Sequence, residues 1–191
     1  MIIKECKMPD ISDLAPSVIG AFLITSLAGS NVGKTKEEIA CFSVIARLID
    51  KAKVEYLTAR EAVIKEVEER KMTYDEITKR DDGQYFFICE ITNHLENCIN
   101  ALSRIYKLRK LLSPKYQFLA NQKEEIVRTR NHIEHIDSRI FGSIPGSRSL
   151  SISEDALNVE IVNENLRLDD LANEIRLLHT DIRRALYEPK E

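Results

Sequence analysis

Apolar residues recur every three or four positions along most of the chain, which is the spacing of helices that bury one face. Four long helices are predicted from this spacing, over residues 35–71, 83–112, 114–140 and 168–187. In the second helix His94 lies beside the apolar stripe, so we expect a hydrogen-bonded histidine at the boundary of the core. In the last helix His179 and Arg183 are one turn apart, and we expect both at the surface.

The remaining segments are shorter and less regular. Residues 1–34 are expected to form an N-terminal arm, loosely held at its start, and one short helix capped by Ser12 or Asp13. Residues 149–153 and 156–162 alternate weakly between apolar and polar, which predicts a β-hairpin. The pattern as a whole predicts an all-α protein, an antiparallel bundle of four to five helices with a small β-hairpin before the C-terminal helix. Residues 1–191 are expected to form a single domain. Its parts are the N-terminal arm with a short helix (1–34), the main bundle (35–141), a loop with the β-hairpin (142–165) and the C-terminal helix (166–188).

The composition fits a folded helical domain. The 191 residues are 43% hydrophobic and 31% charged, with only six glycines and five prolines, and this length suffices to bury a core. The net charge of −3 gives no global signal for nucleic acid, so an RNA site would have to be a local patch. The longest apolar run, 18–28, is too short to span a bilayer and lacks a positive leader. We expect a cytoplasmic protein with no membrane partner.

The four cysteines, Cys6, Cys41, Cys89 and Cys98, show no pairing at metal-ligand spacing. We expect buried, reduced thiols in helices. No acidic cluster converges either, so the sequence indicates neither a metal site nor a cofactor.

One glycine-containing segment admits two interpretations. Residues 28–35 fit a loose form of the phosphate-binding P-loop, in which Lys34 would hold a nucleotide phosphate and Thr35 a magnesium ion. A P-loop also requires a strand before it and a parallel sheet after it, which the predicted helices do not supply. In the favoured interpretation Gly33 ends one helix, and Thr35 with Glu38 forms a capping box that starts the next.

The helix predicted over 114–140 has two chemically different faces. Arg128, His132, His135 and Arg139 fall within about 60° of one another on a helical wheel. The opposite, apolar face consists of Leu119, Ile126, Ile133, Ile136 and Ile140. A surface that gathers guanidinium and imidazole groups suits the binding of phosphate.

The residues Arg130–His135 also resemble a family motif. Their order, arginine, a polar residue, three further residues and histidine, resembles the Arg-polar-x3-His motif of HEPN domains, small all-helical proteins common among prokaryotic toxins and anti-phage systems. The resemblance covers this motif and the helical context, and no residue-by-residue match elsewhere. It implies a metal-independent endoribonuclease with Arg130 and His135 as the catalytic pair and Asn131 as the polar third residue.

The residue types suit this chemistry. Histidine titrates near neutral pH, so His135 can move the proton of a ribose 2′-hydroxyl or of the leaving oxygen. Arginine stays charged and can stabilise the charge that builds up on the phosphate. We expect the neighbouring side chains to bind the RNA substrate, namely Arg128, His132 and Arg139.

Arg130 and His135 point about 140° apart on a straight helix, so one helix cannot bring both onto one phosphate. Two copies related by a two-fold axis can, because such an interface places each motif against its mate. The resemblance likewise implies a homodimer with a shared cleft. By analogy with the family, a cognate antitoxin or a defence-system partner is expected to restrain the activity.

Two alternatives stay open. Ile136 follows the motif histidine where many active HEPN members have a small residue, and some members are inactive. The chain could therefore be a noncatalytic helical module that binds RNA or protein or that dimerises. The third interpretation is a nucleotide-binding enzyme built on the P-loop segment 28–35.

Overall fold

The described part of the chain is a bundle of helices with a small sheet. The computed structural model describes residues 2–14, 17–29, 34–73, 75–76, 87–114, 116, 118, 120, 123–134, 150–161 and 164–187. Their helices are α1 (Val18–Leu27), α2 (Lys36–Glu69), α4 (Ile88–Arg109), α5 (Glu124–Glu134) and α7 (Leu168–Tyr187). Their strands are β1 (Ser151–Ile152), β2 (Asn158–Ile161) and β3 (Glu164–Arg167). The predicted helical bundle with a small β element before the C-terminal helix is confirmed.

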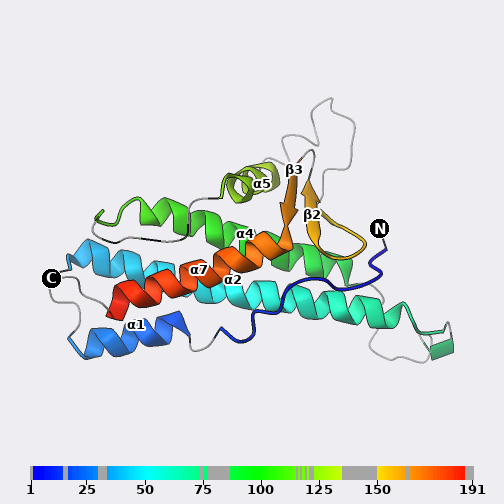
Figure 1. Ribbon diagram of the computed structural model, residues 1–191, viewed down its shortest axis with the longest axis horizontal. Coiled ribbons are helices and arrows are strands. Elements are labelled where there is room, and N and C mark those ends of the chain that lie inside the picture. The colour runs from blue at the N-terminus through cyan, green and yellow to red at the C-terminus, as the bar shows by residue number, and fades with distance from the viewer. Residues whose placement is uncertain are drawn as a thin grey trace.

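The long helices α2, α4 and α7 form the body of the molecule. Figure 1 shows α1 on one side of this body and α5 with the sheet on the opposite side. The start of α2 lies beside the end of α4, where the Cys41 thiol is 3.4 Å from the Leu108 carbonyl, so the two helices are antiparallel. No helix in the described ranges combines the length and the apolar character needed to cross a membrane.

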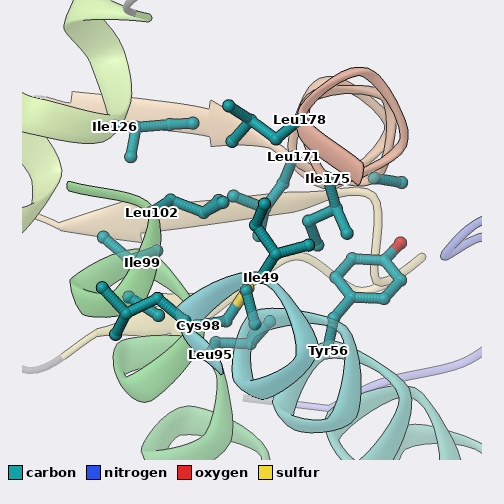
Figure 2. Close-up of a cluster of buried hydrophobic side chains, with 14 of the residues drawn as sticks. Ile49, Tyr56, Leu95, Cys98, Ile99, Leu102, Ile126, Leu171, Ile175 and Leu178 are labelled. Atoms are coloured by element: carbon teal, nitrogen blue, oxygen red, sulfur yellow. The ribbon is translucent and has the colours of Figure 1, made fainter. Parts of the chain in front are cut away.

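The core lies where these helices meet (Figure 2). Ile126 of α5 is fully buried and points toward apolar side chains of α2, α4 and α7, which confirms its predicted place on the inner face. Burial of an isoleucine stabilises the fold by about 1.5–3 kcal/mol, so this contact anchors α5 to the bundle. The other labelled side chains of this buried cluster are Ile49, Tyr56, Leu95, Cys98, Ile99, Leu102, Leu171, Ile175 and Leu178.

The start of α2 is the predicted capping box. The Thr35 hydroxyl accepts the Glu38 N–H at 3.1 Å, and the Glu38 carboxylate accepts the Thr35 N–H at 3.0 Å. The nearest described element before it is the helix α1 rather than a strand. The strand that a P-loop requires is therefore absent from the described residues on that side.

The N-terminal arm is held more firmly than its sequence predicts. Ile3, Met8 and Ile11 are at most 2% exposed, because the arm packs its apolar side chains into the core. The Lys7 N–H also donates to the Asp155 carbonyl at 2.9 Å, which ties the arm to the β1–β2 turn. The expectation of a loosely held arm is wrong.

The cap of α1 also differs from prediction. Ser17, rather than Ser12 or Asp13, is the N-cap, and its hydroxyl accepts the Gly20 N–H at 3.3 Å. Asp50 of α2 accepts the N–H groups of Val18 and Ile19 at 2.9 and 3.0 Å. The start of this helix is thus fixed by the local cap Ser17 together with a distant carboxylate, and only the contribution of Asp50 lies beyond any local pattern.

The helix that carries the motif begins at Glu124, so its predicted start at Pro114 is wrong. The preceding segment is held by side chains of other helices. Asp181 of α7 accepts the Ala120 N–H at 2.8 Å, and Arg109 of α4 donates to the Ala120 carbonyl at 2.5 Å. These bonds use backbone groups that a helix would need for itself.

The β element is larger than the predicted hairpin. It is a three-stranded antiparallel sheet in the order β1-β2-β3. Leu166 of β3 lies opposite Val159 of β2, and both side chains are buried. Leu166 therefore belongs to a strand, so the expected C-terminal part 166–188 starts within β3, whereas the helix itself begins at Leu168 as predicted.

Two surface and core assignments change. His179 is 4% exposed, so its predicted surface position is wrong, whereas Arg183 is half-buried with its guanidinium 5.8 Å from the Tyr187 ring centre. Cys41 and Cys98 are buried free thiols as expected, but Cys89 is exposed.

Candidate functional site

The candidate site is built on α5, which packs against α4 and β3. The residues Ile126 and Thr129 are at most 1% exposed and fix the inward side of the helix. Asn131 is exposed, and Arg128 and His132 lie on the side that faces β3. Packing against two elements therefore determines which motif residues reach solvent.

The centre of the site is one carboxylate between two basic side chains. Arg128 donates from Nε to Glu164 of β3 at 3.1 Å, and His132 Nε2 is 3.9 Å from the other oxygen of Glu164. The hydrogen bond to Glu164 raises the pKa of the Arg128 guanidinium above its ordinary value. The structure thus brings together Arg128 and His132, two of the predicted substrate-binding residues.

Acidic side chains surround Arg128. Besides Glu164, the carboxylates of Glu124 and Glu125 lie 3.6 and 3.9 Å from its guanidinium nitrogens. Both are in the first turn of α5, where the helix dipole favours negative charge. Glu164 is a residue that the sequence did not reveal, because it lies 36 positions away in an unpredicted strand. The weak apolar alternation around Leu166 is the signal that could have found it.

Arg130 belongs to a different side of the helix. Its guanidinium forms an ion pair with Glu134, one turn further on, and its side chain is 17% exposed. Arg128 and Arg130 point about 160° apart on a helical wheel, so the structure does not bring Arg130 to the Glu164 group. Both arginines of α5 are therefore paired with carboxylates of the same chain.

His135 and Arg139, the predicted catalytic histidine and the third substrate-binding residue, lie outside the described residues. So do Leu119, Ile136 and Ile140 of the predicted apolar face. Their placement relative to Arg130 stays a prediction.

A second histidine lies in a polar cluster on the α2–α4 contact. His94 Nδ1 is 2.6 Å from Glu55, and Asn97 donates to the same carboxylate at 3.4 Å. The His94 and Glu55 side chains are 29% and 16% exposed. This confirms His94 as a hydrogen-bonded histidine at the boundary of the core.

Within the described ranges, no three histidine, cysteine, aspartate or glutamate side chains converge in a way that would hold a metal ion. Comparison of the chain with protein-family models, curated proteins and solved structures finds no match in any of the three. A functional proposal therefore depends on the motif and on the geometry of α5.

Proposed function

We propose that the protein is a metal-independent endoribonuclease of the HEPN type that acts as a homodimer. The observation that carries the proposal is the placement of Arg130 and Asn131, the first two motif residues, on α5. Asn131 is exposed, and the ion pair with Glu134 directs the Arg130 guanidinium toward the end of the helix that leads to His135. The arginine and the amide of the motif thus lie next to each other on one short stretch of helix, and His135 follows Glu134 directly in the sequence.

In the proposed reaction His135 removes the proton of a ribose 2′-hydroxyl, and the 2′-oxygen attacks the adjacent phosphorus. The bond to the 5′-oxygen breaks, and this oxygen takes up a proton from the protonated His135 imidazole, so the products carry a 2′,3′-cyclic phosphate and a 5′-hydroxyl. Arg130 stabilises the charge on the phosphate oxygens, and Asn131 orients the reacting groups. The motif of a second copy supplies the group that the first helix cannot turn toward the same phosphate.

The biological setting follows from the resemblance. A ribonuclease of this type would serve as a toxin or anti-phage effector in the cytoplasm, with RNA as substrate. Such an activity requires restraint, and we propose a cognate antitoxin or a defence-system partner for that role.

The test is cleavage of RNA by purified protein in EDTA, with analysis of the product ends. We expect cyclic phosphate ends from the wild type and loss of cleavage in His135→Ala and in Arg130→Ala. His94→Gln is the matched control, because it removes an imidazole from a different contact, with Glu55. Cleavage that stops in EDTA, or that survives in His135→Ala, would contradict the proposed mechanism.

A noncatalytic binding or dimerisation module is the second candidate. It is favoured by an apolar surface on α1, where Leu23, Ile24 and Leu27 are 54%, 65% and 90% exposed. It is also favoured by the pairing of both α5 arginines with carboxylates. This candidate predicts association with RNA or protein and no turnover, and Ile24→Glu would weaken a protein complex while Glu134→Gln would not.

A further inference from the structure

Arg128 and His132 form an anion-binding pair on α5. They are four residues apart and therefore neighbours on one helix face. The two oxygens of Glu164 are 3.1 Å from Arg128 Nε and 3.9 Å from His132 Nε2, so both side chains converge on a single two-oxygen anion. A phosphodiester also presents two oxygens to such a pair.

The anion that occupies this pair is open to exchange. The side chains of Arg128, His132 and Glu164 are 48%, 21% and 22% exposed, so water reaches the contact. Ion pairs at this exposure contribute little net free energy, because water and salt compete with them. A stronger or multivalent anion can therefore replace the carboxylate without unfolding α5.

The position of Glu164 fits this role. It is the first residue of β3, an edge strand of the sheet, and β3 packs beside α5. Glu124 and Glu125 add negative charge around Arg128, so the site repels a phosphate as long as Glu164 occupies it.

We propose that Glu164 is an internal competitor of the RNA backbone at the Arg128–His132 pair. A backbone phosphate of single-stranded RNA displaces the carboxylate and takes its two contacts. The inference rests on the proposed function, and it adds a regulatory residue that lowers RNA affinity in the unbound protein.

The experiment measures binding of a labelled single-stranded oligoribonucleotide by fluorescence anisotropy at several salt concentrations. Glu164→Gln keeps the shape of the side chain and removes its charge. We expect it to bind about two- to fivefold more tightly, the range of an exposed ion pair. The slope of log Kd against log salt should stay close to that of the wild type, because both proteins contact the same number of phosphates once RNA is bound.

Glu160→Gln is the matched control, because Glu160 is an exposed glutamate of β2 in the same sheet. We expect its affinity to equal that of the wild type. In the double variant Arg128→Gln/Glu164→Gln the gain should vanish, because the phosphate no longer has its guanidinium. Glu164→Thr, which suits a strand, replaces Glu164→Gln if the latter unfolds.

The outcomes distinguish failure of the proposed competition by Glu164 from failure of the proposed ribonuclease function. RNA binding by the wild type with no gain in Glu164→Gln, or an equal gain in Glu160→Gln, overturns the competition and leaves the proposed function intact. Weaker binding by Glu164→Gln also overturns it, since Glu164 would then be a supporting residue. Absence of RNA binding in every variant up to about 0.1 mM, the weak end of nonspecific binding, overturns both claims.

Discussion

Two charged clusters of this protein use similar residues in opposite surroundings. In the surface cluster of α5 and β3, Arg128, His132 and Glu164 are each more than one fifth exposed. In the buried cluster between α4 and α7, Glu174 and Asp181 are at most 1% exposed. The first cluster can exchange its partners with solvent anions, and the second cannot.

The buried cluster acts on the fold. The Tyr106 hydroxyl donates to Glu174 at 2.8 Å, and Asp181 holds the Ala120 N–H at 2.8 Å and an Arg184 nitrogen also at 2.8 Å. Because a buried polar group that loses its partner is not rescued by water, each of these bonds fixes a segment in place. Burial, rather than residue type, thus separates a structural ion pair from one that can serve binding.

The largest expected effect comes from Asp181→Ala. It leaves the Ala120 N–H buried without its acceptor and releases Arg184, at a cost of about 1–3 kcal/mol. The melting temperature should fall by about 2–12 °C. Urea unfolding with two probes measures the loss.

Asp181→Asn is the control for Asp181→Ala, since its amide oxygen can still accept the Ala120 N–H. We expect it to lose less stability than the alanine variant. If Asp181→Ala destabilises no more than Glu164→Gln, the distinction between the two clusters is wrong.

The features of the fold that the sequence predicts correctly are those that depend on residues close together in the chain. Local patterns predicted the bounds of α2 and α7 and the capping box of Thr35 and Glu38, because these depend on neighbours within one or two turns. They did not predict the start of α5, which depends on Asp181 of α7 and on Arg109 of α4.

In the candidate site, too, the local arrangement was predictable and the long-range contact was not. The helical wheel placed Arg128 and His132 together, and the structure confirms that they share one side. Glu164 could not be predicted, because it reaches Arg128 only through packing between β3 and α5. The Arg130–Glu134 pair lies within one turn and was open to a local argument that considered i and i+4 charges.

A smaller effect is expected at Glu174. Burial raises the pKa of this carboxyl above its ordinary value, and one of its oxygens accepts no hydrogen bond from the described residues. Between its unfolded and folded pKa values Glu174 binds fewer protons in the unfolded chain, so its contribution to stability should fall as pH rises through this window. Glu174→Gln imitates the protonated acid and should flatten that dependence. Unfolding curves from pH 4 to pH 8 measure it.

Tyr106→Phe tests whether the pH dependence comes from burial of the Glu174 carboxyl or from its hydrogen bond with Tyr106. It removes the hydroxyl that donates to Glu174 and keeps the ring in place. We expect the slope of stability against pH to persist in this variant, because the carboxyl is still buried. A pH dependence of stability in Glu174→Gln identical to that of the wild type would contradict the raised pKa of Glu174.

The smallest effect on stability is expected from Glu134→Gln on the surface side. The variant releases Arg130 from its ion pair but also removes a negative charge at the end of α5, where the helix dipole disfavours it. The two effects oppose each other, so the melting temperature should change by less than about 2 °C. RNA affinity should nevertheless rise, because the Arg130 guanidinium no longer has a competing carboxylate.

Glu61→Gln is the matched control for Glu134→Gln, because Glu61 forms an exposed i,i+4 ion pair with Lys65 on α2. Both variants lose one negative charge and one surface pair. If both raise RNA affinity equally, the gain comes from net charge alone and Arg130 has no special contact with RNA. If Glu134→Gln alone raises RNA affinity, then Arg130, like Arg128, has a carboxylate partner that a phosphate of the RNA can replace.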